Sequence, residues 1–261
     1  MPNRLLFRLA GPLASWGDVT VGEIRSSWQE PSKSAVLGLV AAALGIERHE
    51  EEKHSALHGA LSFAVRVDAW LYDGHKKRPQ PAIPLREFQT TQVPGSERKT
   101  HWPTRADELD RPSHELNTIL SQRWHWQDMV ATICLTARPG RDTDLEGIKD
   151  ALEKPKFPLF LGRKACPVGR PLAPWLDNHP TLGAAFEAYD LIDAKKWKET
   201  SHKVLHHAEE KIWHDNDETG LNVAHTRTRR DTTRSRNNWT FADRLEAMSR
   251  FEPSTNAGAT P

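Results

Sequence analysis

The stretch from Pro31 to Ile46 constrains the fold more than any other part of the chain. Residues 35–46 carry no polar side chain, so a helix here would have no face suited to water. The stretch is too short to cross a bilayer, and the helix must therefore be buried inside protein. Pro31 prevents a helix from entering upstream, and Ser32 or Ser34 can cap the start. Small residues along it would let a sheet approach closely: Gly38, Ala41, Ala42 and Gly45.

The first turn of this helix also predicts an anion site. Ser32, Lys33 and Ser34 lie over backbone N–H groups that have no partner within the helix, and Arg25 is a short loop upstream. A helix N-terminus with hydroxyls and cations is typical of a phosphate site. The alternative is an ordinary capped core helix with a solvated lysine.

Length and composition exclude several classes of protein. The 261 residues suffice for one large or two small domains, and no stretch is long enough for a transmembrane helix. The start is a strand-like run with arginines and not a signal peptide, so a cytoplasmic protein is expected. Cys134 and Cys166 lie far apart without a CxxC motif, which excludes a disulfide framework and a cysteine zinc site. Nothing implies a cofactor.

Charge is unevenly distributed although the net charge is only +1. Basic residues gather in 75–105, 154–176 and 226–250, whereas acidic residues gather in 47–52 and 209–218. If the basic segments converge in space they form a phosphate-binding track, and if they do not they are solvated charge.

Apolar patterning in the first part of the chain indicates a split βαβ unit. Arg4–Leu9 is a predicted strand that ends at the breaker pair Gly11-Pro12, and Leu61–Tyr72 is the strongest predicted strand. The buried helix lies between them. This order is typical of ferredoxin-like domains.

Residues 75–127 read as an excursion from the core. Six prolines interrupt it and apolar periodicity is lost; Leu85–Gln92 is a candidate arm of a projecting hairpin, with its partner after Pro112. The core then resumes with a strand at Asp128–Ala137. A helix at Asp142–Glu153 and a last strand at Phe157–Gly162 complete the prediction.

The predicted fold is therefore α+β, a ferredoxin-like domain at 1–165 with a thumb inserted at about 75–127. Residues 166–252 form a smaller C-terminal region, helical in pattern from Thr181 to His214 and arginine-rich at its end. Residues 253–261 are predicted to be a disordered tail.

Several motifs resemble one family. They are Gly11-Pro-Leu with Ser15-Trp-Gly, Arg25, Pro31-Ser-Lys-Ser opening an Ala/Leu/Gly helix, Phe160-Leu-Gly-Arg-Lys-Ala-Cys-Pro, and Arg229-Arg-Asp followed by Phe241 and Arg244. In order and spacing they are similar to those of the CasD subunit of type I-E CRISPR Cascade complexes. The His- and acid-rich segment 193–220 departs from this pattern.

The resemblance implies a RAMP-type domain, related to the RNA recognition motif, in a hetero-oligomer. In that family the subunit holds the 5′ handle of the CRISPR RNA and contacts the backbone subunit CasC and the large subunit CasA. Target DNA would be engaged only through the complex, and no membrane is involved. Members of this subtype are not nucleases, so no catalytic residue is expected.

Basic segments with interleaved aromatics suit single-stranded RNA, because cations bind phosphate and rings stack on bases. Gly162 would let RNA approach the peptide while Arg163 contacts a phosphate. We expect the helix start, Arg25 and the Gly162–Lys164 turn to act on one ligand, with Lys33 and Arg163 exposed. The candidate RNA-binding residues are Arg25, Ser32, Lys33, Ser34, Arg163 and Lys164, and from the thumb Arg86 and Gln89.

Two other functions remain open. The equivalent type I-C subunit is a metal-independent ribonuclease that processes precursor CRISPR RNA, and Tyr72, Lys99 and His101 could supply that chemistry. The alternative is a basic loop with a surface histidine.

The second alternative is a metal site. His202 and His206 would share a helical face near His207, His214 and Asp215. No HExxH motif or cysteine pair accompanies them, which favours a solvated histidine-rich helix. Cys166 is predicted to be a small core residue.

Overall fold

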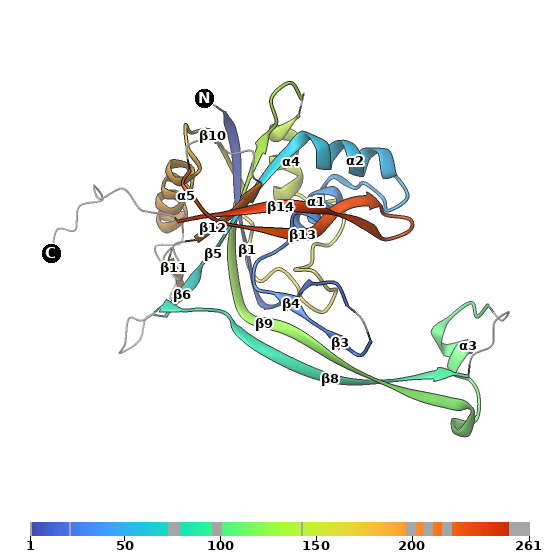
Figure 1. Ribbon diagram of the computed structural model, residues 1–261. Coiled ribbons are helices and arrows are strands. Elements are labelled where there is room, and N and C mark those ends of the chain that lie inside the picture. Colours follow the sequence, from blue (N-terminus) through green and yellow to red (C-terminus); the bar gives the residue numbers. More distant parts are fainter. Residues whose placement is uncertain are drawn as a thin grey trace.

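The computed structural model describes residues 2–20, 22–72, 79–95, 101–141, 143–196, 202–205, 211–215 and 221–250. The fold combines helices with a large, mainly antiparallel sheet (Figure 1). In this described part of the chain, no helix is long and apolar enough to cross a membrane.

The main sheet has nine strands within the described residues, in the order β10-β1-β9-β5-β12-β14-β13, with β3 and β8 also paired to β9. Its strands are β1 (Asn3–Ala14), β3 (Ile24–Arg25), β5 (Leu61–Val67), β8 (Ile83–Pro94), β9 (Leu116–Ala137), β10 (Trp175–Asn178), β12 (Lys211–Asp215), β13 (Val223–Ser235) and β14 (Thr240–Arg250). Because β12 pairs with β5, part of the predicted C-terminal region continues this sheet. The smaller sheets contain β2 (Trp16–Gly17), β4 (Ser27–Trp28), β6 (Ala69–Tyr72), β7 (Pro79–Gln80) and β11 (His202–Leu205).

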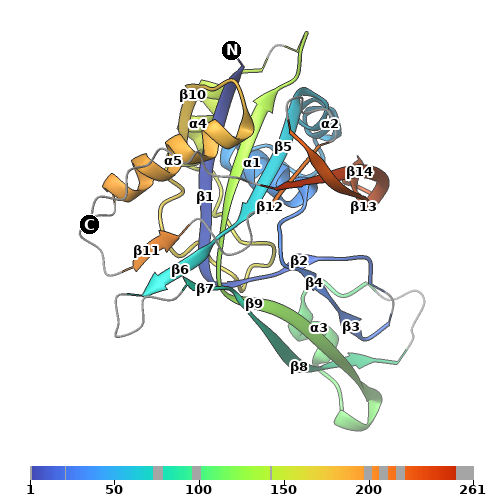
Figure 2. The ribbon, with the colours of Figure 1, turned by 60° about the vertical axis from the view of Figure 1, so that its left-hand side comes forward.

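Helices cover both faces of the sheet. Leu5, Phe7 and Leu9 of β1 pack in one core with α1 (Lys33–Leu44) and α4 (Leu145–Glu153), and Leu57 of α2 (Glu51–Ala60) packs against that core. Leu6 faces the other way and packs with α5 (Leu182–Lys196) in a second core. Because side chains alternate along a strand, β1 contributes residues to both cores. Figures 1 and 2 show α5 on the opposite side from α1 and α4.

The predicted buried helix is confirmed. Ser32 is its N-cap and accepts the Ala35 N–H, and Gly45 closes the other end at φ 76°. Hydrophobic side chains of the helix, such as Val36 and Val40, are fully buried.

The excursion is a long hairpin, as predicted. β8 pairs antiparallel with the first half of β9, from Ile83 opposite Gln127 to Pro94 opposite Leu116. Both views show this hairpin projecting from the sheet, with α3 (Arg105–Leu109) and the short 3-10 helix η1 (Ser113–Glu115) near its tip (Figures 1 and 2). We call it the thumb.

One predicted element is wrong and two others have different bounds. Phe157–Gly162 is a loop with one bridge, Phe160 to Pro167, and the strand beside β1 is β10. The loop forms because the N–H groups of Lys156 and Phe157 donate to the carbonyls of Ala43 and Ala42, near the end of α1.

The strand at the start does not stop at Gly11-Pro12, because β1 reaches Ala14 with Pro12 left out of the pairing. The helical pattern predicted for Thr181–His214 ends at Lys196, and the strands β11 and β12 follow. The helix α2 was not predicted from the sequence. The predicted tail at 253–261 lies outside the described residues.

Candidate nucleic-acid interface

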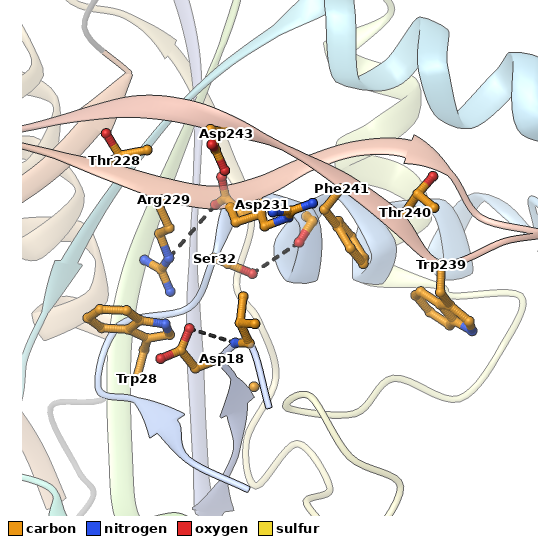
Figure 3. Close-up of a pocket in the computed structure, with 14 residues that line it drawn as sticks. Asp18, Trp28, Ser32, Thr228, Arg229, Asp231, Trp239, Thr240, Phe241 and Asp243 are labelled. Atoms are coloured by element: carbon orange, nitrogen blue, oxygen red, sulfur yellow. Dashed lines mark hydrogen bonds and ion pairs between the residues drawn. The ribbon is translucent and has the colours of Figure 1, made fainter. Parts of the chain in front are cut away.

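A groove runs between the start of α1, the turn of the β13–β14 hairpin and the loop at 158–163. It consists of two hollows that share Gly17, Ser32, Ser34, Trp239 and Phe241. The first, the hairpin hollow, measures about 600 Å³ and is also lined by Asp18, Arg230 and Asp243 (Figure 3). The second, the helix hollow, measures about 420 Å³ and is also lined by Gly162, Arg163 and Arg236. The helix start and the Gly162–Arg163 turn therefore face one groove, as predicted.

The turn that carries Arg163 is held rigidly by backbone contacts. The Leu161 N–H donates to the Cys166 carbonyl (2.7 Å), the Cys166 N–H donates to the Arg163 carbonyl (2.8 Å), and the Ser15 N–H donates to the Leu161 carbonyl (3.0 Å). Gly162 has φ +90°, and a Cβ there would overlap the Ser15 carbonyl oxygen. The close approach that requires this glycine is thus made by the chain's own backbone at Ser15.

Three arginines converge beside this turn. Pairing of β3 with β9 places Arg25 opposite Arg123. Burial, together with the positive charges of Arg123 and Arg25, lowers the pKa of Arg163. Within the described residues, Nη1 of Arg163 and Nε of Arg123 are enclosed without a hydrogen-bond partner. Unpaired donors and crowded like charges would both be relieved by a bound anion.

Lys33 does not belong to this anion site, and its predicted exposure was wrong. Its side chain is 1% exposed, and its Nζ donates to Asp215 (2.6 Å) and to the Leu61 carbonyl (2.8 Å). The lysine points under the helix toward the sheet because a buried carboxylate balances its charge there.

At the start of α1, one of the backbone N–H groups expected to bind an anion already has a partner within the protein. The Lys33 N–H donates to Asp231 (3.0 Å), whose carboxylate is gripped by Arg244 at 2.8 and 2.9 Å. The predicted anion at this helix start is thus an internal aspartate. The hydroxyl side of the turn stays on the groove, because Ser32 and Ser34 line both hollows.

The other predicted contacts are dispersed. Lys164 is exposed beside Arg163, and Arg25 is exposed on β3. Arg86 and Gln89 lie on opposite faces of the thumb, since side chains alternate along β8. Gln89 donates to Glu87 (2.6 Å), which shares its face with Arg123.

A short chain of contacts ties the base of the thumb to the arginine turn. Glu87 contacts His125 Nε2 at 3.0 Å, and His125 Nδ1 lies 3.6 Å from Cys166 Sγ. Cys166 is fully buried, and burial raises the pKa of its thiol. The prediction that Cys166 is a core residue is confirmed.

The ribonuclease residues are not brought together among the described residues. Tyr72 is in β6 at the base of the thumb, whereas His101 is exposed just before α3, near the thumb's tip (Figure 1). Lys99 lies outside the described residues.

The structure removes the helix on which the predicted metal site depended. His202 is in the strand β11 and not on a helical face as predicted. His214 is buried and contacts the Asp215 carbonyl and Ser249 Oγ, and Asp215 pairs with Lys33. His206 and His207 lie outside the described residues. Within the described residues, no group of three or more His, Cys, Asp and Glu side chains could hold a metal ion.

Three groove residues, Arg236, Trp239 and Phe241, were not predicted as site residues, and neither was Arg123 beside Arg163. Two signals existed in the sequence: Arg123 directly precedes the aromatic run 124–126, and Trp239 follows Arg236 and an Asn-Asn turn. Other arginines of the basic 226–250 segment have internal partners. Arg227 and Arg229 contact Glu30 and Glu246, and Arg244 contacts Asp215 and Asp231.

The fold is mixed α/β, with a projecting hairpin and with a groove whose helix hollow is lined by Arg163 and Arg236. Comparison with known proteins shows the family to which this chain belongs. The family described as CRISPR-associated protein (Cas_Cas5) matches residues 4–243. The chain belongs to this family, as the motifs predicted.

Known proteins and structures agree with this assignment. The chain is 33% identical over 172 residues to the CRISPR system Cascade subunit CasD of Escherichia coli (strain K12), covering 66% of this chain and 70% of the relative. A chain of a CRISPR RNA-guided surveillance complex shares the fold with a TM-score of 0.60 at 23% identity, covering 99% of this chain and 94% of that one. A second solved Cas protein gives 0.55 at 24% identity, covering 95% and 94%.

Proposed function

We propose that this chain is the Cascade subunit that binds the 5′ handle of the CRISPR RNA. The observation that carries the proposal is that Arg163, which lines the helix hollow, has the charges of Arg123 and Arg25 close to it. Phosphates of a single strand would satisfy the unpaired guanidinium atoms. Lys164 and the hydroxyls of Ser32 and Ser34 lie where they could contact the same backbone, and Arg86 or Gln89 would act from the thumb.

The proposal includes a place in an assembly. The relative's name makes it a Cascade subunit, and by analogy this chain would contact the backbone subunit CasC and the large subunit CasA, and reach target DNA only through the complex. The element order β1-α1-β5-β9-α4-β10 and the strand order β10-β1-β9-β5 support a ferredoxin-like RAMP domain.

Replacing Arg163 by alanine is expected to weaken binding of a repeat-derived single-stranded RNA roughly tenfold, because a charge-assisted contact to phosphate is lost. The slope of log affinity against log salt concentration should also fall by about one phosphate contact. Filter binding across a salt series measures both. Arg141→Ala, an exposed arginine in a turn away from the groove, is the matched control. Equal affinity in wild type and both variants would contradict the site.

The protein is expected not to cleave its RNA, because Tyr72 and His101, the described residues of the ribonuclease alternative, lie apart, at the base and near the tip of the thumb (Figure 1). Labelled precursor RNA should stay intact with or without chelator. Specific cleavage that is lost in His101→Ala would instead establish the ribonuclease alternative. Cleavage that disappears with chelator and in His202→Ala would establish a metal nuclease.

A further inference from the structure

The turn between β13 and β14 carries an aromatic pair into the groove. Trp239 is 53% exposed, and its ring stacks on that of Phe241 with centroids 6.1 Å apart and planes at 27°. Phe241 lies between Ser32 and Trp239, and Asp18 is across from the hairpin (Figure 3). Large exposed aromatics that line a groove are more often binding surfaces than packing elements.

The backbone at Trp239 is held in an unusual conformation. Its φ is +49°, in the left-handed region that bulky residues rarely adopt. Such a conformation persists only where surrounding contacts enforce it, and it is frequent at ligand sites. Asn238, the residue before it, would have suited the left-handed position better, so the local sequence does not explain the choice.

Two arginines fix the position of the Trp239 ring. The guanidinium of Arg48 lies 4.7 Å from the ring centroid and that of Arg236 lies 5.5 Å from it. Arg48 Nε donates to the Arg236 carbonyl (3.1 Å), and Arg236 Nη2 donates to the Ser34 carbonyl (3.1 Å). Gly38 makes room for Arg236, whose Nη2 would lie 3.1 Å from a Cβ there. The ring is therefore oriented before any ligand arrives.

The two hollows of the groove differ in charge. Among the described residues, the lining of the helix hollow contains Arg163 and Arg236 and no carboxylate. The hairpin hollow is lined by the exposed carboxylates of Asp18 and Asp243 and by the exposed Arg230, while Arg229 and Asp231 in its lining have ion-pair partners within the protein. A phosphate is therefore attracted more strongly to the first hollow than to the second, where carboxylates offset the positive charge. A nucleobase is uncharged, and its amino groups can donate to carboxylates.

We propose that Trp239 and Phe241 form a nucleobase-stacking subsite, in which one unstacked base of a single-stranded RNA lies in the hairpin hollow. Its neighbouring phosphate lies in the helix hollow near Arg163 and Arg236. This inference rests on the proposed function and deepens it, since it assigns base and phosphate to different ends of one groove.

The experiment compares two probes of equal charge, an eight-nucleotide oligo(rA) and the same ribose-phosphate chain without bases. Wild-type full-length chain should prefer oligo(rA), because stacking one base on an aromatic ring strengthens binding by roughly tenfold. Trp239→Ala should lose this preference while its affinity for the abasic chain stays unchanged. Trp239→Phe should retain most of it, and Leu191→Ala, an exposed residue of α5 on the other side of the molecule, should behave as wild type.

The possible failures are distinguishable. If wild type binds neither probe, the proposed function is overturned. If it binds both and Trp239→Ala keeps the full preference for bases, the subsite is overturned while RNA binding stands. An equal loss for both probes that accompanies a lower melting temperature would make Trp239 a structural residue and also overturn the subsite.

Discussion

Replacing Asp215 by asparagine is expected to destabilise the protein by about 3–5 kcal/mol, the typical cost of removing one partner from a buried ion pair. The Asp215 carboxylate accepts from Lys33 Nζ (2.6 Å), from Arg138 (3.0 Å) and from Arg244 (2.8 Å). Without its charge, the ammonium of Lys33 is buried with no anion beside it. Chemical denaturation at neutral pH measures the loss.

Lys33→Met provides the matched comparison, because it removes the other end of the same contact. Asp215 would keep Arg138 and Arg244, so the expected loss is smaller, roughly 1–3 kcal/mol. If the two variants are equally stable, or if Asp215→Asn is as stable as wild type, Asp215 is not the centre of this network.

The acid side of the stability profile gives a second readout. Burial raises the pKa of Asp215, but the charges of Lys33 and Arg244 outweigh it and the pKa is lowered. A carboxyl whose folded pKa lies below its unfolded value of about 3.9 contributes stability above that value. This contribution is lost as the pH falls through the folded pKa. Asp215→Asn should therefore lose less stability than wild type over the same acid range.

Lys33 shows what local sequence cannot specify. The residue was predicted to be an exposed phosphate ligand because it stands in the first turn of a helix, where lysine is usually solvated. Its partner Asp215 is 182 positions away, directly after the segment Thr181–His214 that was predicted to be helical, and lies in the strand β12. Long-range charge pairing across a sheet leaves no local pattern, whereas the apolar run of 35–46 fixes a buried helix by itself.

The same contrast applies to the candidate site. The turn of Arg163 and the start of α1 were expected to meet because their positions follow from a helix that packs on a sheet. Arg123 and Trp239 were missed because exposure and side-chain direction depend on hairpin register, which periodicity alone does not specify. The last strand was misplaced because Phe157–Gly162 is apolar like a strand, although its N–H groups bind the end of α1.

Gly162→Ala is expected to have the second large effect, because it combines strain with a clash. At φ +90° a Cβ costs about 1–3 kcal/mol in strain, and displacing the Ser15 backbone adds an overpacking cost of about 1–3 kcal/mol. Side-chain rotation cannot relieve the clash, since the atoms it meets are the carbonyl oxygen of Ser15 and, at 2.9 Å, its carbonyl carbon.

Gly140→Ala separates the two costs. Gly140 also has a left-handed backbone, with φ +73°, but a Cβ there meets nothing within 4 Å. It should lose only the strain energy, about 1–2 kcal/mol. Thermal or chemical unfolding of the two variants therefore measures the Ser15 contact by difference, and equal losses would show that this contact is not what requires glycine.

The two glycine variants are also expected to differ in RNA binding. Relief of the clash must shift the turn at 161–166, which positions Arg163 through the Cys166 N–H and the Leu161 carbonyl. Gly162→Ala should therefore weaken RNA binding at temperatures where the protein is still folded, at least as much as the roughly tenfold loss expected for Arg163→Ala. Gly140→Ala should bind RNA as wild type does. Unchanged affinity in folded Gly162→Ala would show that the rigid geometry of this turn is not required for the anion site.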